Sequence, residues 1–145
     1  MGHSNCDRCG HDTKMCDCDK QSNFVKQVGG DHYKGKYQHW DWCDDCRVPY
    51  LESAATKYIQ RWRDKNGVED LEKAISYLKK AEGNPRHLPA GCSAYRDDSL
   101  MERYLTSSNV GEAEAAIIRH IGTWNGEPLT GVYAMIQELI DDLPL

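Results

Sequence analysis

The sequence has no long apolar run and no excess of basic residues. None of its apolar stretches approaches the about 20 residues that a membrane-spanning helix requires. Its 145 residues carry a formal net charge of -5 at pH 7, whereas general duplex binding requires a basic surface. We therefore expect a soluble protein with no membrane partner and no general binding of duplex DNA, although a local basic patch is compatible with this composition.

The sequence also lacks the motifs of several common enzyme classes. It has no Gly-x-x-x-x-Gly-Lys-Ser/Thr phosphate loop, no kinase catalytic-loop signature, no Gly-x-Ser-x-Gly elbow and no His-Glu-x-x-His helix. A phosphotransferase with this sequence would therefore have an unusual architecture.

Composition divides the chain into four segments within the size of one ordinary domain. Residues 1–23 are rich in cysteine and poor in large apolar side chains, and residues 24–82 have the most regular patterns. Residues 83–98 carry two glycines and two prolines without periodicity, which indicates a linker or a long loop. Residues 99–145 contain the C-terminal helices.

Four of the seven cysteines lie within residues 1–23. The odd count and the expected absence of a signal peptide favour a reducing cytoplasm over a secreted disulfide scaffold. Four thiolates in a polar segment suit a tetrahedral, structural zinc site without an open position for water. The predicted ligands of this zinc knuckle are Cys6, Cys9, Cys16 and Cys18. The alternative is an unstructured, reduced tail that binds no metal.

Cys43 and Cys46 form a second close pair. On a helix their spacing places both thiols on one face, where they could bind metal or pack. We favour packing over a ligand role, because free cysteine is commonly buried.

Two segments have the apolar spacing of amphipathic helices and predict a helical hairpin at about 50–82. The first spans 51–62. Its apolar spacing leaves on the opposite, outward side Glu52, Thr56, Lys57, Gln60, Arg61 and Arg63. In the second, Asn66 and Glu69 predict a capping box ahead of a buried stripe. This stripe consists of Leu71, Ala74, Ile75, Leu78 and Ala81.

A C-terminal helix pair is also expected. Asn109 and Glu112 predict the start of one helix, whose inner face contains Ala113, Ala116, Ile117, His120 and Ile121. The other spans about 131–143 and buries Val132, Met135, Ile136, Leu139, Ile140 and Leu143. Strand signals are confined to 24–28 and 33–39. The expected fold class is mainly α, with short extended pieces near 24–39 and the zinc knuckle.

The segment Gly29-Gly30-Asp31-His32-Tyr33-Lys34 combines a flexible backbone with ionisable side chains. Its two glycines let the backbone approach a ligand and expose amide groups. Asp31 can hold magnesium or accept a proton, and His32 and Lys34 can offer positive charge. The alternative is a tight turn in which Asp31 caps its own backbone and His32 packs in the core.

Basic residues on the first hairpin helix are candidates for phosphate binding. Lys57 and Arg61 are one turn apart and project together, and arginine can bind phosphate through two parallel hydrogen bonds. Arg63 and Lys65 follow, and the alternative for all four is a solvated helix face. Tyr58 is expected in the core, as is Tyr77 on the second helix, with base stacking as the alternative.

Together these residues resemble the signature of a small phage-encoded family catalogued as a domain of unknown function. The resemblance spans about residues 28–81. It is carried by Gly29-Gly30-Asp31-His32-Tyr33-Lys34, by Lys57-Tyr58-Ile59-Gln60-Arg61, by Gly67-Val68-Glu69-Asp70-Leu71-Glu72-Lys73-Ala74, and by Tyr77 and Leu78. The amino-terminal cysteines and the Cys43 and Cys46 pair depart from the family pattern.

At least one member of that family is regarded as a nucleoside-monophosphate kinase. The resemblance therefore implies phosphoryl transfer from ATP, with magnesium, to a deoxynucleoside monophosphate in the host cytoplasm. Asp31, His32 and Lys34 are the candidate catalytic residues. The candidate phosphate- or nucleotide-binding residues are Gly29, Gly30, Tyr33, Lys57, Arg61, Arg63 and Lys65.

A homo-oligomer is expected, because a short hairpin cannot enclose a nucleotide alone. Two rival functions remain. One is a protein that sequesters a nucleotide or second messenger without chemistry. The other is a zinc-containing module that binds a host protein.

Overall fold

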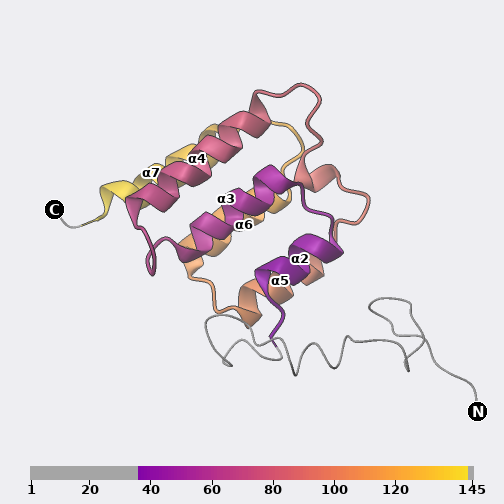
Figure 1. Ribbon diagram of the computed structural model, residues 1–145, viewed down its shortest axis with the longest axis horizontal. Helices are drawn as coiled ribbons and strands as arrows, with labels where there is room; N and C mark the ends of the chain where they lie inside the picture. The colour runs from indigo at the N-terminus through magenta and orange to yellow at the C-terminus, as the bar shows by residue number, and fades with distance from the viewer. Residues whose placement is uncertain (1–35, 144–145) are drawn as a thin grey trace, which may run out of the picture. The chain divides into compact units, whose positions relative to one another are not determined.

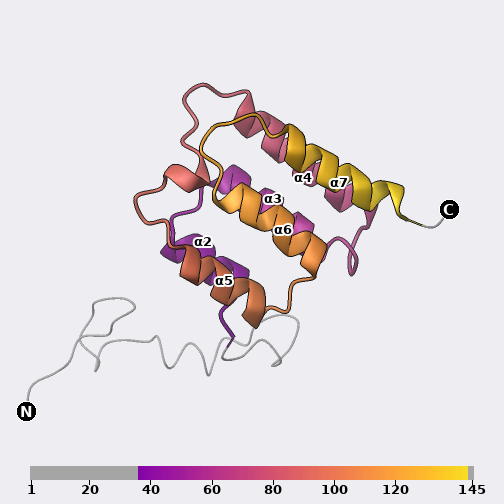
Figure 2. The ribbon, with the colours of Figure 1, turned by 180° about the vertical axis from the view of Figure 1, so that it is seen from behind.

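The computed structural model describes residues 36–143, whose helices form two layers of three (Figure 1). One layer contains α2 (His39–Asp45), α3 (Tyr50–Arg61) and α4 (Val68–Glu82). The other contains α5 (Asp98–Ser107), α6 (Glu112–Gly122) and α7 (Thr130–Asp141). Seen from behind, α5 lies over α2, α6 over α3 and α7 over α4 (Figure 2). The described residues contain no strand, so the prediction of a mainly α fold is confirmed.

The hydrophobic core lies between the two layers. Ile59 of α3 and Ile117 and Ile121 of α6 are at most 1 % exposed. Trp42 of α2 stacks on Tyr104 of α5, with ring centroids 5.4 Å apart. Removing these large apolar side chains from water is the main driving force for packing one layer on the other.

The predicted helical hairpin is present as α3 and α4. Leu71 and Leu78 are fully buried, as the apolar stripe of the second helix predicts. The predicted capping box is wrong: the N-cap residue of α4 is Gly67, whose φ of 60° lies in the left-handed region that favours glycine. Asn66 instead donates hydrogen bonds to Asp70 from its backbone (3.2 Å) and its side chain (3.3 Å).

α3 is buried around more of its circumference than its sequence predicts. Glu52 and Thr56, both expected to face outward, are 0 % exposed. The reason is that α3 packs against both α4 and α6, and the loop after α4 covers it as well. Glu52 accepts hydrogen bonds from His87 Nε2 at 2.7 Å and from the backbone amide of Ala90 at 2.8 Å. A buried carboxylate needs such partners, and here they come from a distant segment.

Residues 83–98 form a long loop around the short 3-10 helix η2 (Ala90–Cys92). The amide of Gly91 donates to the carbonyl of Trp124 at 2.7 Å. A Cβ atom at Gly91 would lie 2.4 Å from the carbonyl oxygen of Thr123, so only glycine permits this approach of two backbones. The loop is therefore held against α3 and against the end of α6.

The C-terminal region contains three helices where the sequence predicts two. The additional helix, α5, begins after Asp97, whose carboxylate accepts hydrogen bonds from the amides of Ser99 and Leu100. The predicted cap of α6 is wrong, because its N-cap residue is Gly111 rather than Asn109. The prediction for α7 is confirmed in part: Val132, Ile136 and Leu139 are buried, whereas Met135, Ile140 and Leu143 are only partly buried.

The buried face of α6 is rotated from the predicted one. Ile117 and Ile121 are buried as expected, but Ala113 and His120 are exposed. Glu114, Ala115 and Ile118 are buried instead. Because Ile117 and Ile118 are adjacent, the sequence is compatible with either of two buried faces of α6. Packing against α3 determines which of the two is buried. The buried carboxylate of Glu114 accepts a hydrogen bond from Trp62 Nε1 at 2.8 Å.

The structure describes only the end of the predicted extended pieces. Gln38 has an extended backbone as the N-cap residue of α2, and His39 is already helical, so the prediction of an extended residue there is wrong. The predicted zinc knuckle and the segment from Gly29 to Lys34 lie outside the described residues. Every helix within residues 36–143 is too short or too polar to span a bilayer.

Candidate functional site

A cleft of about 410 Å³ lies between α2, α3 and α4. His39, Trp40, Cys43 and Asp44 line it from α2. The remaining lining residues are Tyr50, Ser53, Ala54, Lys57 and Tyr58 of α3 and Tyr77 of α4. The hairpin and α2 therefore shape a cavity of the size that small-molecule sites usually have.

One end of the cleft is aromatic. Tyr50 is 71 % exposed and Trp40 is 58 % exposed, although large aromatic side chains are usually more buried. Tyr58 stacks on Tyr77 with ring centroids 5.8 Å apart, and Tyr50 meets the same Tyr77 ring edge-on at 6.0 Å. This end therefore offers flat apolar surfaces on which a planar ligand can stack.

Three cations surround the ring of Tyr58, and of these only Lys57 lines the cleft. The amine of Lys57 and the guanidinium of Arg61 lie 4.9 Å and 4.8 Å from the centroid of the Tyr58 ring. Lys73 of α4 approaches the same centroid to 5.5 Å. We call Lys57, Arg61 and Lys73 the Tyr58 cation cluster. The structure thus brings together two predicted phosphate-binding residues and adds a third cation from the neighbouring helix.

The cleft lining contains one carboxylate, Asp44, and two further carboxylates pair with Arg61 and Lys73. Arg61 Nε lies 3.4 Å from a carboxylate oxygen of Asp70, which is 0 % exposed. Lys73 lies 3.7 Å from Glu69 on the same helix. Hydrogen bonds from Asn66 and contact with Arg61 lower the pKa of Asp70 against the opposing effect of desolvation, so its carboxylate stays charged. Lys57 has no ion-pair partner among the described residues.

Of the predicted phosphate-binding residues on the hairpin, Lys57 lines the cleft, whereas Arg61, Arg63 and Lys65 do not. Arg63 Nε lies 3.0 Å from Glu114 of α6, and its guanidinium lies 4.4 Å from the ring centroid of Trp62. Arg63 therefore bridges the two helix layers. Lys65 is exposed in the turn between α3 and α4.

The floor of the cleft holds a neutral histidine. The Thr56 hydroxyl donates to backbone carbonyls of its own helix, so it accepts the hydrogen of His39 Nε2 at 2.8 Å. Burial, with a smaller effect from Lys57, lowers the pKa of His39 to about 4. Burial raises the pKa of the adjacent Cys43 thiol to about 12. Both groups are therefore uncharged at neutral pH, so the charged side chains in the cleft lining are Lys57 and Asp44.

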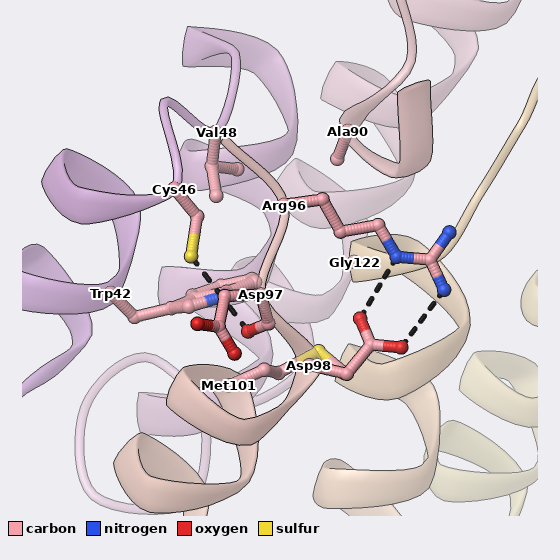
Figure 3. A pocket seen from close by; sticks show the side chains of 9 residues that line it. All are labelled: Trp42, Cys46, Val48, Ala90, Arg96, Asp97, Asp98, Met101 and Gly122. Atoms are coloured by element: carbon pink, nitrogen blue, oxygen red, sulfur yellow. Dashed lines mark hydrogen bonds and ion pairs between the residues drawn. The ribbon is translucent and has the colours of Figure 1, made fainter. Parts of the chain in front are cut away.

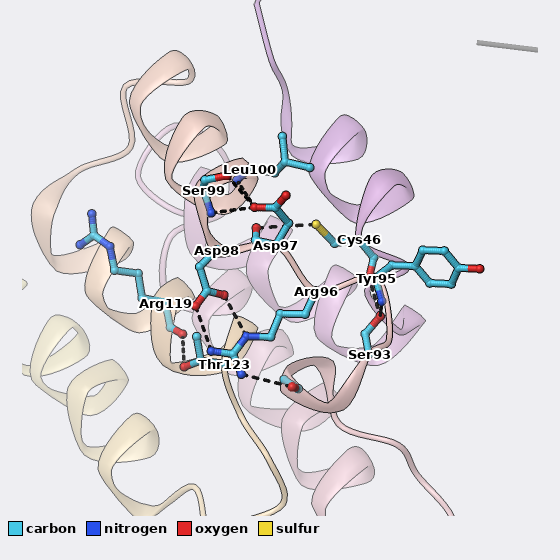
Figure 4. Close-up of polar contacts among 11 residues, drawn as sticks. Cys46, Ser93, Tyr95, Arg96, Asp97, Asp98, Ser99, Leu100, Arg119 and Thr123 are labelled. Atoms are coloured by element: carbon cyan, nitrogen blue, oxygen red, sulfur yellow. Dashed lines mark hydrogen bonds and ion pairs between the residues drawn. The ribbon is translucent and has the colours of Figure 1, made fainter. Parts of the chain in front are cut away.

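The second predicted cysteine, Cys46, is 2 % exposed, and its thiol lies 3.8 Å from the carbonyl oxygen of Asp97. It lines a cavity of only about 10 Å³ beside the ion pair of Arg96 and Asp98 (Figure 3). Such a volume holds at most about one water molecule. Ser93 donates to the carbonyl of Cys46 at 2.7 Å, so this network joins α2 to the start of α5 (Figure 4). Within residues 36–143 there is no group of metal-ligating side chains.

The remaining predicted site residues lie outside the described part of the chain. They are Gly29, Gly30, Asp31, His32, Tyr33 and Lys34, together with the zinc ligands Cys6, Cys9, Cys16 and Cys18. Their roles stay predictions. Sequence reasoning missed Trp40 and Tyr50 as parts of a cleft, although aromatic residues on polar helix faces are a signal that could have marked them.

Comparisons with models of known families, with curated proteins and with solved structures find no match for this chain. The resemblance to the phage family therefore stays an expectation carried by its residues. Arguments about function have to come from the geometry of the cleft.

Proposed function

We propose that this protein binds a nucleotide in the cleft between α2, α3 and α4 and transfers a phosphoryl group from ATP to a deoxynucleoside monophosphate. The observation that carries the binding proposal is a cleft lined by the exposed rings of Trp40 and Tyr50 and by Lys57. The transfer reaction comes from the family resemblance. In the reaction an acceptor phosphate oxygen bonds to the γ-phosphorus, the bond from that phosphorus to the β,γ-bridging oxygen breaks, and ADP leaves.

The aromatic end suits a nucleobase. Trp40 on α2 and Tyr50 on α3 expose their rings at the cleft, where every base can stack through its π face. The stacked pair of Tyr58 and Tyr77 gives this end a rigid apolar wall. A volume of about 410 Å³ suits a single ligand of nucleotide size.

Lys57, the cation in the cleft lining, suits phosphate. Lys57 lies two helical turns after Tyr50, about 10 Å along α3, so a base at one end and phosphate at the other would fit the spacing. The protein as a whole carries a net charge of -5, whereas Lys57 has no ion-pair partner among residues 36–143. Ordered cations that need no rearrangement are the main requirement of phosphoryl transfer.

The predicted loop from Gly29 to Lys34 would supply the remaining chemistry. Lys34 precedes the cleft residue His39 by five residues, so the chain can separate them by at most about 18 Å. Asp31 would hold magnesium bound to ATP, while His32 and Lys34 would contact the transferring group. The zinc knuckle would be structural, and a second copy of the chain could cover the open side of the cleft.

Calorimetric titration with nucleoside mono- and triphosphates, beside a phosphoryl-transfer assay, tests this proposal. Lys57→Gln should weaken binding about tenfold, the loss of one charge-assisted contact. Trp40→Ala should cost about 1–3 kcal/mol of binding through lost stacking. Lys80→Gln, an exposed lysine on the outer part of α4, is the matched control and should bind like the parent.

Asp31→Ala separates binding from chemistry. It should retain most nucleotide binding and lose turnover, because its predicted partner is the metal at the reacting group. Binding without turnover in the parent protein would instead indicate a sequestering protein. No binding of any nucleotide would refute the proposal and favour a host-protein interaction module.

A further inference from the structure

We infer that the cleft between α2, α3 and α4 selects nucleotides whose base carries an exocyclic amine, and that Asp44 makes this selection. The inference rests on the proposed nucleotide binding and adds the class of base that the site accepts. Adenine, cytosine and guanine carry such an amine, whereas thymine and uracil do not.

The two charged side chains of the cleft lining lie on different helices. Asp44 lines the cleft from α2, and Lys57 lines it from α3. Both are exposed, and among residues 36–143 neither has an ion-pair partner. A nucleotide carries its negative charge on phosphate, which Lys57 attracts and Asp44 repels. The phosphate of a bound nucleotide therefore lies at Lys57, and its base lies toward Asp44.

Asp44 also lies beside a surface on which a base can stack. Trp40 and Asp44 are four residues apart on α2, so their side chains are neighbours on one face of that helix. Both line the cleft, and the Trp40 ring is exposed. A base that stacks on this ring presents its polar edge to the carboxylate.

The chemistry of a carboxylate decides which base edge it accepts. An ionised carboxylate accepts hydrogen bonds and cannot donate them, whereas the tyrosine and serine hydroxyls of the lining can do both. Cytosine presents the two hydrogens of its N4 amine where uracil presents a carbonyl oxygen. Asp44 therefore forms a charge-assisted hydrogen bond with the amine and repels the carbonyl oxygen.

The matched probes are dCMP and dUMP, which have the same sugar, the same phosphate and a ring of the same size. Calorimetric titration of the parent should give about tenfold tighter binding of dCMP, the effect of one charge-assisted hydrogen bond. The purine pair dAMP and dIMP differs by the same exchange of an amine for a carbonyl and should show the same order.

Three variants locate the origin of the preference. In Asp44→Asn the ratio of the two dissociation constants should fall to within about twofold, because an amide can accept from the amine or donate to the carbonyl. The ratio is the readout, since loss of the negative charge affects the phosphate of both ligands alike. Lys57→Gln should weaken both ligands and keep the ratio. Glu72→Gln, which removes an exposed carboxylate of α4 outside the cleft lining, is the control and should match the parent.

The outcomes separate this inference from the proposed function. Equal binding of dCMP and dUMP by the parent, or a preference that persists in Asp44→Asn, would overturn the inference and leave nucleotide binding intact. Loss of the preference in Lys57→Gln would contradict the assigned direction of the nucleotide and overturn it as well. Circular dichroism should show the same helix content in every variant. If the parent binds no nucleotide, the proposed function fails too.

Discussion

Replacing His39 with glutamine should remove a large part of the pH dependence of folding stability below neutral pH. His39 lies on the floor of the cleft, where it donates to Thr56, contacts the Cys43 thiol and faces the charge of Lys57. Its pKa of about 4 in the folded protein compares with an ordinary value of 6.5. Between these values the unfolded chain binds a proton at this side chain and the folded chain does not.

The sign and the size follow from proton linkage. Because folding depresses the pKa of His39, the stabilisation is fully present above pH 6.5 and is lost as the pH falls toward 4. Lowering the pH from 7.5 to 5 should cost about 2 kcal/mol of unfolding free energy through this residue alone. The loss arises because the imidazolium would have to be buried beside a lysine.

Urea unfolding of the parent and of His39→Gln at several pH values measures this contribution. Glutamine preserves a donor at the position of Nε2 but does not titrate. The readout is the difference between pH values, so a uniform loss of stability in the variant does not affect it. His120→Gln, an exposed histidine of α6, serves as the control and should retain the pH dependence of the parent. An unchanged pH dependence in His39→Gln would refute the assignment of a buried neutral histidine.

Three further outcomes are expected. Leu78→Ala should destabilise the protein by about 2 to 5 kcal/mol, since Leu78 is fully buried, whereas the exposed Glu72→Ala should stay within about 0.5 kcal/mol in the same denaturation experiment. Glu52→Ala should cost about 3 kcal/mol or more, because it leaves a partly buried histidine and a buried amide without their acceptor, and a loss no larger than that of Glu72→Ala would contradict this. Elemental analysis should find about one zinc per chain, and a Cys6→Ala, Cys9→Ala double variant should lose it.

The helices were the most predictable part of this structure. The 3.6-residue apolar period in α3, α4 and α7 is a local property, so their positions follow from the sequence alone. α5 is the exception, since it is short and only three of its residues are buried: Met101, Tyr104 and Leu105. Asp97 and Ser99 mark the start of α5. Such residues are also common in loops, so they indicate a helix only when a strong apolar period follows.

Burial of polar residues was the least predictable part. Glu52 and Thr56 were expected to face solvent, and Glu114 was not among the predicted inner-face residues of its helix, because their sequence neighbours offer no partners. They are buried because His87, His39 and Trp62 approach them from other elements. A carboxylate or a hydroxyl can lie in a core only where such donors arrive, and that depends on how the helices pack.

The candidate site was predictable only in part. Lys57 and Arg61 share a helix face, a relation that spacing fixes within α3. Their association with Tyr77 and Lys73 requires the antiparallel packing of α4, and the open aromatic end requires α2 beside Tyr50. The sequence by itself determined the helical class, the hairpin and its basic face, because these depend on period and on nearest neighbours. Only the tertiary structure decided which charges are buried, which are paired and which line a cleft, because those properties depend on contacts between segments far apart in the chain.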